Sequence, residues 1–371
     1  YVCPSHYIPL ASPAKVRQGL KWMFNAQSPF YIHPSLHRDL FDWGLKFLRS
    51  ANAGHLERSA IPLRDIALLS HREYSVWSAS PEFDFTLENK GLLEIFRTPA
   101  MREHAAHIVQ RGRQLELEME LLEKEALQQL EPETPLDALG AIYFKCDSHL
   151  YPNRLMRSLR TVLEQQGVRL LPHREVTRFD CRNGKVQRVL AGEEEFEADQ
   201  VVLAAGSWSK RLAASVGVAL PLMPGRGYSF NLEGGDFQLN HPALLMERSV
   251  ALTPLNESTM RFGGTMEVTP VGTPPRYRRV RGIVDAVNAY FPAARLEVPP
   301  QESIWFGYRP CSADGLPYIG RTKRCSNLLL ATGHAMVGLS LGAGTGKLVA
   351  ELATGQTPSV DIKPFAVERF R

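Results

Sequence analysis

One arginine in this sequence, Arg309, lies in a context that favours binding of a small carboxylate. It follows the apolar residues 304–306 and precedes Pro310, and these neighbours predict a buried side chain. A buried guanidinium needs an anionic partner, and its planar fork binds a carboxylate through two parallel hydrogen bonds. The sequence therefore predicts a site for an amino acid or another small acid. The alternative is a structural ion pair with a protein carboxylate such as Asp314.

A glycine-rich bend after residues 327–332 could hold a flat cofactor. Glycines precede or open the last helix at positions 333, 338, 342, 344 and 346. Glycine lets the backbone approach a ligand closely, and the positive charge of a helix start favours a reduced, anionic flavin. His334 could donate a hydrogen bond to such a ring or serve a structural role. The alternative for the whole bend is a connection that binds nothing.

Three other patterns do not indicate a site. Residues 344–347 resemble a phosphate-binding loop, but Leu341 and Leu348 break the required motif. His33 and His37 have helical spacing without a third ligand, so no metal site is predicted. The acidic residues between 116 and 125 are expected on the solvated face of one long helix.

The composition narrows the classes of protein. The chain has 371 residues, of which 44% are hydrophobic, and a formal net charge of +4. This length favours two domains, and the small charge excess without a basic stripe argues against nucleic-acid binding. The five cysteines are odd in number and far apart, which argues against disulfides and favours a reducing, cytoplasmic compartment. No apolar run has membrane-spanning length, and the first residue is Tyr1, not methionine.

Helices dominate the predicted N-terminal segment, residues 1–80. Residues 14–24 and 40–48 each present an apolar face, with Lys or Arg on the polar side. Packing against the body of the protein explains both helices. The alternative is a peripheral contact of residues 14–48 with a membrane surface, such as the inner membrane, through Trp22 and Trp43.

Beyond residue 80, helical and strand-like patterns alternate. They predict a strand at 91–97, helices at 99–130 and 150–167, strands at 168–171, 175–179 and 198–204, and a hairpin turn at Asn183-Gly184. The last of these strands ends in small residues, which is typical of a dinucleotide-binding domain. We therefore expect a substrate domain formed by 81–140 and 223–305, and a cofactor domain formed by 141–222 and 306–371.

Several motifs in a fixed order resemble the D-amino-acid-oxidase-type FAD-dependent oxidoreductases. They are residues 4–24, the strand end at 201–209, Gly227-Tyr228-Ser229, the run 261–267 (Arg-Phe-Gly-Gly-Thr-Met-Glu), the block around Arg309 and residues 333–346. The resemblance covers nearly the whole chain and is nearer to the small subunit of bacterial D-amino acid dehydrogenases than to glycine oxidase. Val250 departs from glycine oxidase, which carries a substrate-contacting tyrosine there.

The resemblance implies a fold and a set of site residues. The fold would be an α/β FAD-binding domain of the glutathione-reductase-like Rossmann type, joined to a mixed α+β substrate domain. Arg309 would bind the substrate carboxylate, and Tyr228 would face the same cavity. Implied contacts with FAD are Val176 at the adenine, Ala205, Gly206 and Trp208 along the dinucleotide, and Gly333, His334, Gly338 and Leu339 at the flavin ring. Tyr1 and Val2 would begin where the chain passes the flavin.

One part of the family pattern is absent from this sequence. The family opens with a strand, a GxGxxG turn, a helix and an acidic residue, which together need a βαβ unit of at least ~30 residues. The sequence could be truncated, the unit could be supplied separately, or the chain could lack FAD. We expect truncation.

The resemblance implies oxidative deamination of a D-amino acid, or oxidation of a cyclic imino acid, by hydride transfer to flavin N5. Arg309 would anchor the substrate, and a respiratory acceptor would take the electrons. One alternative is an oxidase of glycine, sarcosine or hydroxyproline that uses oxygen. A second alternative is a non-catalytic scaffold without FAD.

Overall fold

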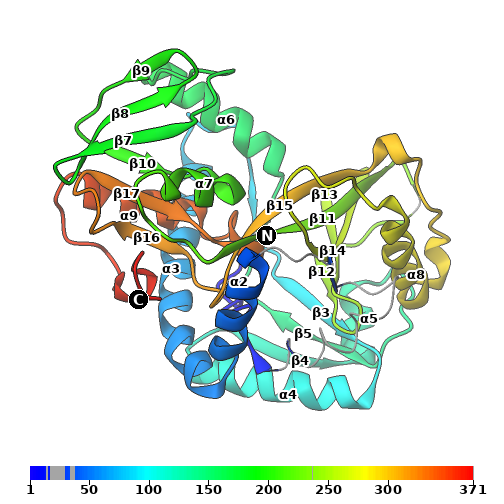
Figure 1. Cartoon of the computed structure of the whole chain (residues 1–371). Coiled ribbons are helices and arrows are strands. Elements are labelled where there is room, and N and C mark those ends of the chain that lie inside the picture. The colour runs from blue at the N-terminus through cyan, green and yellow to red at the C-terminus, as the bar shows by residue number, and fades with distance from the viewer. Residues whose placement is uncertain (14–15, 17–29, 34–37, 236, 371) are drawn as a thin grey trace.

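The computed structural model describes residues 1–13, 16, 30–33, 38–235 and 237–370. The chain forms two parts that lie side by side (Figure 1). One part is built on a nine-stranded sheet, and the other contains two three-stranded sheets. The helix predicted over 14–24 falls largely outside the described residues.

The nine-stranded sheet has the order β15-β11-β14-β13-β12-β3-β5-β4, with β1 beside β14. Its strands are β1 (Phe30–Ile32), β3 (Leu92–Phe96), β4 (Met119–Glu123), β5 (Gly140–Phe144), β11 (Leu222–Glu233), β12 (Ala243–Leu245), β13 (Val250–Asn256), β14 (Thr259–Val268) and β15 (Trp305–Ser312). Along β14, Met260 and Phe262 are completely buried, whereas Arg261 and Gly263 between and after them are partly exposed. This two-residue period shows that the two faces of the sheet have different surroundings.

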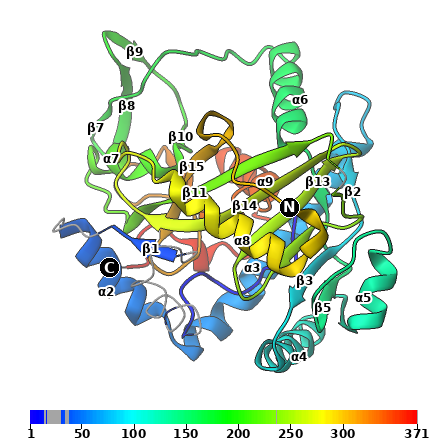
Figure 2. The same cartoon turned by 90° about the vertical axis from the view of Figure 1, so that its right-hand side faces the viewer.

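Helices cover the two faces at different places. α8 (Val280–Tyr290) and α5 (Lys124–Leu130) pack on one face, where Phe230 and Phe262 join Ile283 in a buried cluster. α4 (Pro99–Gln114) packs over β4 and β5 on the other face. Figure 2 shows α8 crossing in front of β11 and β14. β15 is the strand at one edge of the large sheet. It contacts the segment that follows β17, so this edge meets the second part of the molecule.

The second part is organised around the sheet β10-β17-β16. Its elements are β7 (Arg178–Arg182), β8 (Lys185–Ala191), β9 (Glu194–Phe196), β10 (Val201–Leu203), β16 (Tyr318–Arg321), β17 (Leu328–Thr332), α3 (Ala53–Ala79), α6 (Pro152–Gln165), α7 (Ser209–Ala214) and α9 (Gly342–Ala353). β10 and β17 run parallel, with Val201 opposite Leu328. β7, β8 and β9 form the other three-stranded sheet.

α9 packs closely against α3 because one of its residues is glycine. A Cβ added to Gly344 would lie 2.9 Å from both the Ile66 carbonyl oxygen and the Ser70 nitrogen. α3 is itself well started, since the side chain of Asn52 accepts a hydrogen bond from the His55 N–H at 2.9 Å. Helix packing therefore explains one of the glycines in the predicted cofactor bend.

Two predicted elements are wrong, and one turn is confirmed. The single helix predicted at 99–130 ends at Gln114, and Glu116 (φ of +59°) turns the chain into β4 and then α5. Residues 168–171 form no strand. The hairpin between β7 and β8 turns at Asn183 and Gly184, whose φ values of +51° and +70° match the predicted turn type.

Cys181 and Cys325 form a disulfide, so the prediction of no disulfide is wrong. They lie on β7 and just before β17, 144 residues apart in the sequence. The β7–β8 turn folds onto this second segment, where the Ser326 N–H donates to the Gly184 carbonyl at 2.7 Å. The spacing of the two cysteines along the chain did not indicate that they lie close together. The pairing also removes the cysteine-based argument for a reducing compartment.

The helix predicted at 40–48 is α2 (Arg38–Ser50). Trp43 is buried, whereas Phe41, Leu45 and Leu48 form an exposed apolar stripe. No described helix combines the length and the apolar character needed to cross a membrane. β5 and β15 both run across the predicted domain boundaries at 140/141 and 305/306, and the division into domains stays a prediction.

Candidate active site

Arg309 lies within β15, and its side chain reaches over the neighbouring strand. β15 pairs with β11 so that Arg309 is opposite Gly225. The guanidinium lies over Gly227, where an added Cβ would be 1.9 Å from Nη1, so a side chain there would displace it. Nη1 donates a hydrogen bond to the Thr265 carbonyl at 3.1 Å. Burial lowers the pKa of Arg309, and the nearby charge of Arg261 lowers it further.

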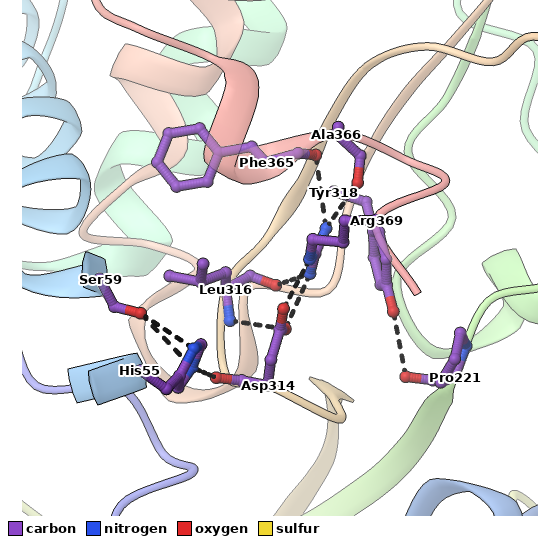
Figure 3. A network of polar contacts seen from close by, with 9 residues as sticks. All are labelled: His55, Ser59, Pro221, Asp314, Leu316, Tyr318, Phe365, Ala366 and Arg369. Atoms are coloured by element: carbon purple, nitrogen blue, oxygen red, sulfur yellow. Dashed lines mark hydrogen bonds and ion pairs between the residues drawn. The ribbon is translucent and has the colours of Figure 1, made fainter. Parts of the chain in front are cut away.

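No carboxylate forms an ion pair with Arg309 among the residues that the structure describes. Asp314, the predicted alternative partner, pairs with Arg369 through contacts of 2.6 and 2.8 Å (Figure 3). Arg369 also donates to the Leu316 carbonyl at 2.7 Å and lies 4.0 Å from the centre of the Tyr318 ring. The structural ion pair is therefore wrong. The Arg309 guanidinium can bind an anion from outside the chain.

A second arginine, Arg261 on β14, lies opposite Asn231 of β11 and Thr253 of β13. Its Nη2 donates to Ser229 Oγ at 2.8 Å, and its Cζ lies 5.4 Å from the centre of the Trp305 ring. Burial lowers the pKa of Arg261, and no carboxylate pairs with it in the described part of the chain. It lines a cavity of about 150 Å³ together with Tyr1, Leu150, Pro152, Ala251, Thr253, Leu255 and Gly263.

Thr265 has a strained backbone beside Arg309. Its φ is +66°, a conformation that β-branched residues rarely adopt and that costs roughly 1–3 kcal/mol. Its carbonyl accepts the Arg309 hydrogen bond, and its Oγ1 is buried without a hydrogen-bond partner in the described structure. Such strain is typical of functional sites. Neither Thr265 nor Arg261 was predicted as a site residue, although both belong to the run 261–267.

Tyr228 lies on the opposite face of the sheet, so its predicted place in the substrate cavity is wrong. Its side chain is 1% exposed and packs with Phe306 in the core under α8. The hydroxyl donates to Glu267 Oε2 at 3.0 Å and accepts from the Arg276 N–H at 2.7 Å. Phe306 is opposite Tyr228, and Arg309 lies three residues further along β15. An odd separation on a strand places two side chains on opposite faces.

The glycine-rich bend after β17 lies next to β15. Gly333 has a φ of +83°, and His334 forms a backbone bridge with Cys311, two residues beyond Arg309. His334 Nε2 contacts Thr345 Oγ1 at 3.0 Å. Burial lowers the pKa of the imidazole to about 4, so the ring is neutral near pH 7. Arg309 and the bend therefore lie next to each other.

The N-terminal residues pass the same bend. Val2 is fully buried, and the Cys3 N–H donates a hydrogen bond to Ser340 Oγ at 2.8 Å. Ser340 is the residue that follows Leu339. Tyr1 reaches the cavity on the large sheet. The structure thus brings into one region Tyr1, Val2, Gly333, His334, Gly338 and Leu339. Their contacts with a flavin stay predictions.

Residues 205–208 of the predicted dinucleotide site follow β10, and Gly206 contacts the end of β17. Gly206 has a φ of +52°, and its carbonyl accepts a hydrogen bond from Thr332 Oγ1 at 3.1 Å. Trp208 is 49% exposed and meets the Tyr308 ring edge-on, with 6.2 Å between ring centres. Val176 packs in the same apolar cluster as Ala205, on the β10–β17 side of this part. The roles of these residues also stay predictions.

A family model described as FAD dependent oxidoreductase (DAO) matches residues 46–352. This chain belongs to that family. The D-amino acid dehydrogenases of Granulibacter bethesdensis and Bradyrhizobium diazoefficiens are each 27% identical, over 376 and 384 residues; both alignments cover 100% of this chain and 88% of the relative. A solved glycine oxidase from Geobacillus kaustophilus has a TM-score of 0.76 at 24% identity, covering 83% of each chain. These matches confirm the expected fold class.

The residues around the bend of this DAO-family chain fit FAD, the cofactor of the family. Ser207 Oγ is buried beside Gly206 and has no hydrogen-bond partner in the described structure. Gly206 has a positive φ, and nothing lies within 4 Å of a Cβ added there, so its backbone is open to a close neighbour. The positive φ of Gly333 goes with a tight contact inside the protein, since a Cβ added there would lie 2.7 Å from the Tyr318 ring. The neutral ring of His334 adds no charge that would oppose or favour one redox state. Residues 205–208 and 333–339 would therefore hold FAD.

A separate polar cluster lies where the N-terminal segment meets the end of β5. Cys3, His6 and Asp147 offer ligand atoms that all lie within 4.8 Å of one another. The Asp147 carboxylate accepts hydrogen bonds from the Ser5 N–H at 3.0 Å and from the Ser5 hydroxyl at 2.5 Å. Burial raises the pKa of Asp147 to about 6. These bonds hold residues 3–6 against the large sheet.

Proposed function

We propose that this protein oxidises a D-amino acid at its Cα. FAD, which residues 205–208 and 333–339 would hold, would supply the acceptor for the substrate hydride. The amine loses a proton, and water then converts the imine to a keto acid and ammonia. The observation that carries this proposal is Arg309, a partly buried guanidinium with no carboxylate partner among the described residues, next to the bend that fits FAD. The names of the curated relatives support the substrate class.

The residues of the chain act mainly by binding and orientation. Arg309 holds the substrate carboxylate through two parallel hydrogen bonds, and the Thr265 carbonyl fixes the guanidinium at 3.1 Å. Because Arg309 is two residues from the bridge between Cys311 and His334, the bound substrate lies against the bend. Positioning of this kind lowers the barrier without an acid–base side chain.

We further propose that a respiratory acceptor at the inner membrane receives the electrons. The exposed stripe of Phe41, Leu45 and Leu48 on α2 supports a peripheral membrane contact, since apolar residues at this spacing suit the interface of a bilayer. Oxygen as the acceptor is the alternative, and it requires peroxide to form in air during turnover. Turnover that needs a quinone or dye and makes no peroxide supports the proposal.

The test uses FAD-loaded protein mixed anaerobically with a panel of D- and L-amino acids. We expect loss of the visible flavin absorbance with at least one D-amino acid. Arg309→Leu removes a partly desolvated, charge-assisted contact, so the substrate concentration for half-maximal reduction should rise about 100-fold or more. Arg281→Leu, at an exposed position on α8, is the matched control. An unchanged half-maximal concentration in Arg309→Leu contradicts the proposal, as does bleaching by L-amino acids alone.

A further inference from the structure

Arg261 and Arg309 place two guanidinium groups on one face of the large sheet. Trp305 and Arg309 share a face because they are four residues apart on β15, and Trp305 is opposite Ser229 of β11. The Arg309 guanidinium lies over Gly227, and the Arg261 guanidinium donates to Ser229. Gly227 and Ser229 are two residues apart on β11, so the two backbone positions that the guanidinium groups contact are about 7 Å apart along this strand.

Neither cation is neutralised by a described side chain. Arg309 donates to a backbone carbonyl, and Arg261 donates to the hydroxyl of Ser229. Both groups are partly removed from water, and the charge of Arg261 disfavours the charged form of Arg309. Two desolvated like charges are costly unless an anion lies between them. A ligand with two negative groups would relieve both.

The cavity beside Arg261 is otherwise mainly apolar. Its walls include Leu150 and Ala251. Its other side-chain hydroxyls are already used within the wall, because Thr253 donates to the Tyr1 hydroxyl at 3.1 Å and that hydroxyl donates to a backbone carbonyl at 2.8 Å. Arg261 is thus the charged side chain in the lining of this cavity. An apolar wall that ends at a cation suits a short methylene chain with a terminal carboxylate.

We propose that Arg261 binds a second carboxylate of the substrate, so that amino acids with acidic side chains are preferred. Arg309 binds the α-carboxylate, the methylene groups lie along the apolar wall, and the terminal carboxylate accepts hydrogen bonds from Arg261. Ser229 keeps the second guanidinium in position. This inference rests on the proposed function, because it names the substrate class of the same site.

Steady-state kinetics on FAD-loaded protein test this with D-glutamate and D-alanine. We expect Arg261→Met to lower kcat/KM for D-glutamate about 100-fold, mainly through KM, because truncating one partner of a desolvated charge pair removes binding. For D-alanine, the change should be less than about threefold. Arg261→Lys keeps the charge without the planar fork and should lie between the two. Arg281→Met is the matched surface control.

Equal losses of kcat/KM for both substrates would give Arg261 a structural role and overturn the inference.

A second measurement separates the inference about Arg261 from the proposed function. Calorimetry compares glutarate with butyrate, neither of which can be deaminated. We expect tighter binding of glutarate in the wild type and no preference in Arg261→Met. If no D-amino acid reduces the flavin but the glutarate preference is found, the proposed function fails and the second carboxylate site stands. Equal binding of the two acids by the wild type overturns the site.

Discussion

His334 makes the stability of the bend depend on pH. Burial lowers the pKa of its imidazole from 6.5 to about 4. Between these values the unfolded chain binds a proton that the folded chain does not bind. The stability contributed by the neutral ring is therefore complete above pH 6.5 and is lost as the pH falls toward 4. A difference of this size corresponds to about 3 kcal/mol at most.

The substitution His334→Gln should remove this dependence while leaving an amide near Thr345. We expect the wild type to lose more unfolding free energy than the variant when the pH falls from about 7 to about 4.5. Denaturant unfolding at both pH values measures the difference. His107→Gln, at an exposed position on α4, controls for the substitution itself. Parallel losses in the wild type and in His334→Gln would show that the imidazole is not desolvated in the folded protein.

At the residue scale, the sequence identified Arg309 because its apolar neighbours predicted burial, and burial of a cation requires an anion. The side of the strand that each residue faces was not available from the motif. Tyr228 was therefore assigned to the cavity although its hydroxyl bonds to Glu267 in the core. The positive φ of Thr265 is equally invisible in a sequence, since nothing local demands it of a threonine.

At the scale of elements, α2 has apolar residues on two sides. Trp43 is buried, and further apolar side chains face the solvent. Phe41, Leu45 and Leu48 are 65%, 51% and 59% exposed, and their spacing places them on one side of the helix. Burying such side chains in a membrane interface is worth roughly 1–2 kcal/mol each. This contribution is large enough to measure by substitution.

The double substitution Phe41→Asp and Leu48→Asp should weaken binding to liposomes of inner-membrane lipids at least about tenfold. Sedimentation of the protein with liposomes measures the effect. Met156→Asp is the matched control, since Met156 is 59% exposed on α6, in the other part of the molecule. Identical sedimentation of the wild type and the double variant would contradict a membrane contact through α2.

The apolar periodicity of residues 99–130 predicted one helix, but only the part up to Gln114 belongs to α4. Leucines at 117, 121 and 122 fit a helical face, but β4 pairs with β5 and takes its conformation from that partner. The hairpin at Asn183-Gly184 was predicted correctly because its two positive φ values are a local requirement that these two residue types meet. Elements set by nearby residues were predictable, and those set by a distant strand were not.

At the scale of the whole molecule, the bond between Cys181 and Cys325 closes a loop of 144 residues. In the chain-entropy description, closing a loop of this length destabilises the unfolded state by up to about 5 kcal/mol. We expect the double substitution of both cysteines by serine to lower the denaturant midpoint, and a reductant to lower the wild-type midpoint to a similar value. The reductant should leave the double variant unchanged. A wild-type midpoint that does not respond to reductant would contradict a stabilising disulfide.

β15 carries Arg309 at one end of the site and Cys311, bridged to His334, at the other. Because one strand carries both residues, β15 alone would fix the position of the bound substrate relative to the bend under the proposed function. Substitution of cavity-wall residues such as Ala251 and Leu255 would then change which substrate is preferred without moving Arg309 relative to the bend. In this arrangement, the cavity wall would determine which substrate is chosen, and β15 would position the reacting groups.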